Sequence, residues 1–143
     1  MVIPHFSNLI ELLKHRATCQ SGETAYTFLQ DGEVEAHQLS YQELEQQAQA
    51  IARQLLQIAQ PGERALLLYP PGLPFITALL GCLYAGIVAV PSNPPRRKQK
   101  RSRLGAIASD AQPTFIHSTT HIWQHLQKQR EDYPLITRLA VFT

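Results

Sequence analysis

Residues 65–91 have the sequence ALLLYPPGLPFITALLGCLYAGIVAVP, in which two short apolar runs flank a longer apolar segment. The first run, 65–69, is bounded by turn residues and predicts a strand that is buried on both faces. After a Pro-Pro-Gly turn, residues 75–85 are apolar nearly all round, which is typical of a buried helix. Gly86 can take the left-handed conformation that ends such a helix, and residues 87–90 predict a second buried strand. The stretch therefore predicts a strand–helix–strand unit with parallel strands.

The segment that precedes this unit predicts a long amphipathic helix over residues 41–59. Its apolar residues recur in alternating steps of three and four and so share one face: Tyr41, Leu44, Ala48, Ile51, Leu55 and Ile58. Ser40 and Glu43 have the spacing of a capping box, in which each side chain satisfies a backbone N–H at the start of the helix. Leu39 is placed to contact Leu44 across that cap as a hydrophobic staple. A Pro-Gly pair ends the helix.

The alternation of strands and helices extends in both directions from this core. Downstream we predict helices at 104–111 and 122–130, and strands at 114–117 and 139–142. Upstream we predict a helix at 9–15 and a hairpin formed by strands at 25–29 and 36–39. The fold class predicted is α/β: a partial doubly wound parallel sheet with helices on both faces, preceded by an N-terminal helix and hairpin.

Composition limits the classes of protein to which the chain can belong. With 143 residues, 44% hydrophobic and 17% charged, it fits one folded domain, and its net charge of +2 does not indicate a polyanionic partner for the whole molecule. Cys19 and Cys82 have no nearby Cys partner, which predicts reduced thiols. The longest apolar stretch, 75–91, is shorter than the ~20 residues of a membrane span, and the first residues lack a secretory pattern. We therefore expect a soluble, cytoplasmic protein without a membrane span.

Two segments resemble core motifs of the adenylate-forming (AMP-binding, acyl-CoA synthetase-like) superfamily. Residues 39–44, LSYQEL, are similar to the Leu-Ser/Thr-Tyr-x-Glu-Leu motif that opens the first long helix of the family. Residues 83–91, LYAGIVAVP, are similar to the second motif, in which Ala-Gly precedes an apolar strand that ends in proline. The order and separation of the two motifs make the combination specific. The resemblance covers residues 25–143 and implies the N-terminal portion of the family's large domain.

Finer features resemble the fatty acyl-AMP ligase branch more than acyl-CoA synthetases or peptide-synthetase domains. They are LYPPGL at 68–73, VPSNPP at 90–95, and the spacing of Arg-Leu, Ile and Asp-Ala within 103–111. Family members more often have Ala-Tyr where Ser92-Asn93 stands and an acidic residue where Pro74 stands. The resemblance implies that the complete enzyme uses ATP and Mg²⁺ to convert a fatty acid into an acyl-adenylate, and then transfers the acyl group to an acyl carrier protein. A long-chain acyl-CoA synthetase is the alternative within the enzyme class.

The groups that this chemistry needs come, in the family, from a Ser/Thr/Gly-rich loop, from later strands and from a C-terminal domain that bears a lysine. The seven glycines of this chain are dispersed among helix ends and turns and do not cluster into a phosphate-binding loop. We therefore expect residues 1–143 to form a single truncated domain that is inactive alone and has no catalytic, cofactor-binding or metal-binding residues of its own. Its expected partners are the remainder of the enzyme and an acyl carrier protein. An uncovered sheet edge would favour homo-oligomers.

A Pro-flanked basic loop at 92–103 holds six of the 13 Lys and Arg residues: Arg96, Arg97, Lys98, Lys100, Arg101 and Arg103. The first interpretation of this basic loop is a solvated linker, and the second is a docking patch for an acidic carrier protein. Nucleic-acid binding is disfavoured because no aromatic residues interleave for base stacking. The alternative to an enzyme fragment is a stand-alone α/β binding module that uses the basic loop to hold an acidic protein or nucleic acid.

Several other residues suggest sites but have simpler interpretations. Three histidines recur every four residues: His117, His121 and His125. Only the last two share a predicted helix and no acidic residue or cysteine completes the set, so we expect surface histidines rather than a zinc site. Tyr69 and Tyr84 flank the buried helix and are expected to pack in the core rather than to line an acyl tunnel. Cys82 is expected to be an inert small hydrophobe.

Overall fold

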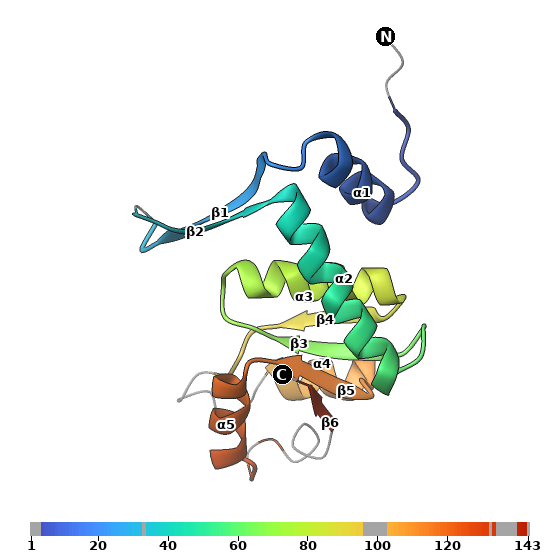
Figure 1. Ribbon diagram of the computed structural model, residues 1–143. Helices are drawn as coiled ribbons and strands as arrows, with labels where there is room; N and C mark the ends of the chain where they lie inside the picture. The colour runs from blue at the N-terminus through green and yellow to red at the C-terminus, as the bar shows by residue number, and fades with distance from the viewer. Residues whose placement is uncertain (1–3, 33, 96–102, 132, 134–139, 143) are drawn as a thin grey trace.

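The computed structural model describes residues 4–32, 34–95, 103–131, 133 and 140–142 (Figure 1). The described helices are α1 Leu9–Cys19, α2 Tyr41–Ile58, α3 Leu73–Ala85, α4 Arg103–Ala111 and α5 Thr120–Lys128. The described strands are β1 Thr24–Gln30, β2 Val34–Ser40, β3 Arg64–Leu68, β4 Val88–Ser92, β5 Phe115–Ser118 and β6 Ala140–Phe142. Each predicted element is present, with ends shifted by a few residues, as expected where hydrogen bonding rather than hydrophobicity sets the boundary.

Four of the described strands form a parallel sheet in the order β4-β3-β5-β6, so β3 lies between two neighbours. Leu66 of β3 is opposite Val90 of β4 and Ile116 of β5. The chain runs from β3 to β4 on one side and then crosses back to β5 on the other side of β3. In Figure 1 helices α2 and α3 cover one face of the sheet, while α4 and α5 lie toward the other. The predicted doubly wound parallel sheet with helices on both faces is therefore confirmed.

The side chains of β3 alternate between the two halves of the core. Ala65 and Leu67 pack with residues of α2 and α3, whereas Leu66 and Leu68 pack with residues of α4, β5 and α5. All four of these side chains are fully buried. A strand that is covered on both faces needs a continuous apolar run rather than alternation, which is the pattern seen in the sequence.

The start of α2 shows the predicted capping box. The Ser40 hydroxyl accepts a hydrogen bond from the Glu43 backbone N–H at 3.2 Å, and the Glu43 carboxylate accepts one from the Ser40 backbone N–H at 2.8 Å. These bonds to Ser40 lower the pKa of Glu43. Leu39 and Leu44 are both buried in the same cluster with Leu13 of α1, so the staple also joins α1 to the body of the domain.

Strands β1 and β2 form an antiparallel hairpin in which Thr27 is opposite Gln38. The hairpin extends away from the parallel sheet (Figure 1), and Tyr26, Leu29 and Val34 are exposed on it. The predicted N-terminal helix and hairpin are therefore confirmed. Among the residues that the structure describes, no helix is both long enough and apolar enough to cross a membrane.

Two glycines, one within α3 and one directly after it, are needed for different reasons. Gly86 has φ of 70° and ends the helix, because a left-handed residue there lets its N–H bond to the Cys82 and Leu83 carbonyls. Gly81 lies where α3 contacts α2, and a Cβ there would be 2.5 Å from Ile51 Cγ2 and 3.2 Å from the Ala48 carbonyl oxygen. The absence of a side chain at position 81 therefore allows the two helices to pack closely.

We predict that Gly81→Ala lowers the free energy of unfolding by about 1–3 kcal/mol, because the added methyl group forces α2 and α3 apart. Urea denaturation followed by circular dichroism measures this. Gly22→Ala is the matched control, because a Cβ at Gly22 would meet nothing within 4 Å and this residue does not have a positive φ. Equal stability of the Gly81→Ala and Gly22→Ala variants would contradict the packing at Gly81.

Candidate functional site

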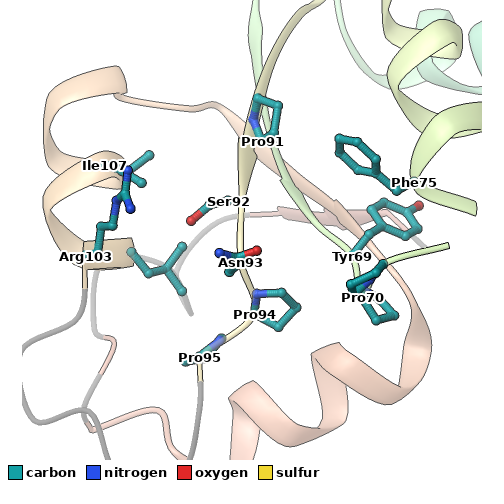
Figure 2. Close-up of a pocket in the computed structure, with 12 residues that line it drawn as sticks. Tyr69, Pro70, Phe75, Pro91, Ser92, Asn93, Pro94, Pro95, Arg103 and Ile107 are labelled. Atoms are coloured by element: carbon teal, nitrogen blue, oxygen red, sulfur yellow. The ribbon is translucent and has the colours of Figure 1, made fainter. Parts of the chain in front are cut away.

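A cleft of about 680 Å³ lies at the carboxyl ends of β3 and β4 (Figure 2). Its lining comprises residues 69–71 after β3, Phe75 of α3, residues 91–95 at the end of β4, and Arg103, Leu104 and Ile107 of α4. Ligands of open α/β sheets bind outside the carboxyl ends of the strands, where successive connections diverge to opposite sides. The position of the cleft follows from the strand order.

Figure 2 shows how the side chains are arranged around this cleft. Arg103 and Ile107 lie together on α4, and Tyr69 and Phe75 lie together on the opposite side. Ser92 and Asn93 stand between the two groups. The cleft therefore has an aromatic side, a side on α4 with the cationic Arg103 and the aliphatic Leu104 and Ile107, and polar groups between the two sides.

Tyr69 contacts His117, which lies on the neighbouring strand β5. The Tyr69 hydroxyl lies 3.3 Å from Nδ1 and 3.5 Å from Nε2 of His117, and the two rings meet edge to face with centroids 5.6 Å apart. Next to this pair the Ser118 hydroxyl donates a hydrogen bond to the Leu68 carbonyl at 2.5 Å. These contacts join the ends of β3 and β5 and fix the Tyr69 ring that lines the cleft.

His117 is only 3% exposed, so the expectation of a surface histidine is wrong at this position. The reason is that all four residues of β5 are buried, because helices cover both faces of that strand. Burial lowers the pKa of His117 to about 4, which keeps its imidazole neutral at physiological pH. On α5, His121 is exposed, as expected, whereas His125 is half-buried. The described residues contain no group of three or more His, Cys, Asp or Glu that could hold a metal ion.

Tyr84 and Cys82 behave as core residues, as predicted. The Tyr84 hydroxyl donates to the Glu45 carboxylate at 3.1 Å, and the Lys14 ammonium lies 5.6 Å from the centre of the Tyr84 ring. Burial raises the pKa of Tyr84 to about 12 and that of the Cys82 thiol to about 12, so both stay protonated. Tyr69 differs, because its ring packs against the core and also lines the cleft.

The structure places one residue of the predicted basic loop. Arg103 is the first residue of α4, is exposed, and lines the cleft. The others, Arg96, Arg97, Lys98, Lys100 and Arg101, lie outside the described residues. The sequence did not single out His117 together with Tyr69, because 48 residues separate them and only the register of β3 with β5 brings them together.

Comparison with known proteins agrees with the two motifs and with the fold that contains them. The family model described as AMP-binding enzyme matches residues 13–141. The chain belongs to this AMP-binding enzyme family. A crystal structure of a fatty acyl-adenylate ligase from Legionella pneumophila, in complex with acyl adenylate and pyrophosphate, superimposes with a TM-score of 0.81 and 33% sequence identity over 97% of this chain and 23% of that one.

Curated members of the AMP-binding family include two similar ligases. JamA of Moorena producens, a medium-chain-fatty-acid–acyl-carrier-protein ligase, is 54% identical over 116 residues, which are 79% of this chain. FadD26 of Mycobacterium marinum, a long-chain-fatty-acid–AMP ligase, is 35% identical over 114 residues, or 78% of the chain. In both cases the matched part is 20% of the relative, so this chain spans about a fifth of their length.

We predict that the free energy of unfolding falls as the pH is lowered from 6.5 to 4, because His117 has its usual pKa of 6.5 in the unfolded chain and about 4 in the folded one. Between these values the unfolded state takes up a proton that the folded state does not, so the stabilisation present above pH 6.5 is lost as the pH falls. The loss due to His117 is about 3 kcal/mol.

Urea denaturation across this pH range measures the effect. His117→Gln should flatten the pH dependence, and His121→Gln, which replaces an exposed histidine, is the matched control. The variants are compared by the slope of the free energy of unfolding against pH. A loss of stability that is the same at every pH does not change this slope. The same slope in the wild type and in His117→Gln would contradict a buried, neutral His117.

Proposed function

We propose that this chain is a segment of a fatty acyl-AMP ligase. In its complete form the enzyme converts a fatty acid and ATP into an acyl-adenylate and pyrophosphate, and then transfers the acyl group to the thiol of an acyl carrier protein. The observation that supports this most strongly is the 54% identity to JamA over 79% of the chain. The Legionella structure, with 33% identity and a TM-score of 0.81, supports the same assignment. Residues 1–143 are then part of a larger domain that activates a fatty acid with ATP.

ATP and Mg²⁺ are assigned in this proposal to the remainder of the enzyme. Magnesium needs carboxylate and other oxygen ligands, and a triphosphate needs a loop of backbone N–H groups or cationic side chains. The described residues contain no cluster of acidic residues, cysteines or histidines that could hold a metal. The glycines are dispersed along the chain rather than gathered into a loop. The groups that catalyse adenylation are therefore proposed to lie in the remainder of the enzyme.

The proposal predicts that this chain can replace the corresponding segment of a working ligase. A chimera in which the 116 matched residues of JamA are exchanged for those of this chain should retain fatty-acid-dependent ATP–pyrophosphate exchange. We expect an exchange rate within about tenfold of JamA, because the parallel sheet and its core are preserved. The isolated 143-residue chain should give only the buffer rate.

A matched control is the same chimera with Leu66→Asp and Leu67→Asp, which bury two charges in β3 and should abolish exchange. A folded chimera that is inactive while JamA is active would contradict the proposal and favour a stand-alone binding module. Exchange by the isolated chain would contradict its assignment as an incomplete catalytic unit.

The basic loop at 92–103 is proposed to dock the carrier protein. An acidic carrier would be attracted by a dense positive patch, which mainly raises the rate of association and is screened over ~8 Å at physiological salt. Replacing Arg96, Arg97, Lys98, Lys100, Arg101 and Arg103 by Ser in the chimera should slow acyl transfer, most at low salt, and leave adenylate formation unchanged.

Arg53→Ser and Arg130→Ser remove exposed cations elsewhere on the chain and serve as charge controls. Equal loss of both half-reactions in the loop variant would indicate a folding role for the loop. Unchanged transfer at low salt would make the loop a solvated linker.

A further inference from the structure

Two polar side chains at the end of β4 stand between the two sides of the cleft (Figure 2). Ser92 is the last residue of β4 and is half-buried, and Asn93 follows it. Both line the cleft, and neither side chain forms a hydrogen bond with another residue that the structure describes. By contrast, the buried Ser118 hydroxyl at the end of β5 donates to the Leu68 carbonyl. The hydrogen-bonding capacity of Ser92 and Asn93 is therefore available to a ligand.

The surface on both sides of these two residues is apolar. Tyr69 and Phe75 lie on one side, Leu104 and Ile107 lie on the other, and five prolines complete the apolar lining. The cleft volume of about 680 Å³ lies within the range of small-molecule sites, in which a few polar groups orient a mainly apolar ligand. The lining therefore fits an apolar molecule that carries a polar group part-way along its length.

A purely hydrocarbon chain is a poor match for this arrangement. It would displace water from Ser92 and Asn93 without offering hydrogen bonds in return, and a polar group that loses its water without a new partner lowers the affinity. A hydroxyl group both donates and accepts hydrogen bonds, as do the serine hydroxyl and, through its two ends, the asparagine amide. A hydroxyl on the ligand can therefore replace the water that binding displaces.

Under the proposed function, only the chain of a fatty acid is available to this cleft. The carboxylate has to react with ATP, which is assigned to the remainder of the enzyme. Arg103 is exposed at the first position of α4 and belongs to the basic loop that is proposed to dock the carrier protein, so it is given no contact with the acid. Discrimination between acids at this cleft then depends on Ser92 and Asn93.

We propose that Ser92 and Asn93 are specificity-determining residues that select a fatty acid with a hydroxyl group on its alkyl chain. The Ser92 hydroxyl and the Asn93 amide bind the substituent, while the apolar sides of the cleft contact the methylene groups around it. This inference rests on the proposed function, because it assumes that the enzyme activates a fatty acid. The preference for a hydroxylated chain rests on the lining residues alone.

The test is ATP–pyrophosphate exchange by the product of the complete reading frame. It is measured with decanoate, or with the saturated acid of the chain length that the enzyme prefers, and with monohydroxylated derivatives of the same acid. We expect at least one hydroxylated acid to have a kcat/KM about tenfold above that of the unsubstituted acid, because a site that bonds a substrate hydroxyl rejects the analogue that lacks it. Ser92→Ala combined with Asn93→Leu should reduce this ratio to about one. The ratio is taken within each variant, so a general loss of activity does not change it.

Ser92→Thr keeps the hydroxyl and should keep the preference. Ser7→Ala, which replaces an exposed serine outside the cleft, is the matched control, and circular dichroism checks that each variant is folded. Equal kcat/KM for the unsubstituted acid and every hydroxylated derivative would overturn the inference and leave the proposed function standing. So would a preference that survives the combined Ser92→Ala and Asn93→Leu substitutions. A folded protein that shows no exchange with any fatty acid would instead overturn the proposed function, and this inference with it.

Discussion

Strand β3 is hydrogen-bonded on both edges and covered on both faces, and the rest of the structure depends on its burial. Leu66, Leu67 and Leu68 are completely inaccessible to solvent. Each buried leucine side chain contributes about 1.5–3 kcal/mol relative to exposure. These contributions act on two separate helix layers, because alternate residues face α2–α3 and α4–α5. Loss of β3 would therefore uncouple both layers as well as both neighbouring strands.

The central place of β3 also determines where a ligand can be held. The carboxyl ends of the parallel strands β4, β3 and β5 lie at the same edge of the sheet. The connection after β3 passes through α3 on one face, and the connection after β4 passes through α4 on the other and returns to β5 beyond β3. Tyr69 follows the last residue of β3, Asn93 follows β4, and His117 occupies the third position of β5. The cleft and the Tyr69–His117 pair are consequences of this single topology. The same position explains why His117 is buried although it is polar, because the end of β5 is enclosed by the helix layer that covers β3.

Much of the fold could be predicted from local patterns in the sequence. Two predictions depend only on residues that are close together in the sequence: the buried strand from the apolar run at 65–69, and the helix start from the capping box at Ser40 and Glu43. Both are confirmed, because the interactions that form them are local. The motifs at 39–44 and 83–91 also consist of neighbouring residues, and their resemblance to the family can be seen in the sequence alone. The burial of His117 was not predictable in this way, because a single polar residue in a four-residue strand does not show which faces are covered. Its contact with Tyr69 depends on strand register across 48 residues. Arg103 was part of the predicted basic loop, but its place in the cleft depends on how α4 packs.

We propose that this parallel sheet belongs to an enzyme that activates fatty acids. The most direct test uses the product of the complete reading frame in which this sequence lies. The protein is incubated with Mg²⁺, ATP and a series of fatty acids, without coenzyme A or carrier protein, and the products are analysed by mass spectrometry. The account predicts an acyl-adenylate for at least one fatty acid, with release of pyrophosphate. A folded protein that forms no acyl-adenylate with any chain length would contradict it.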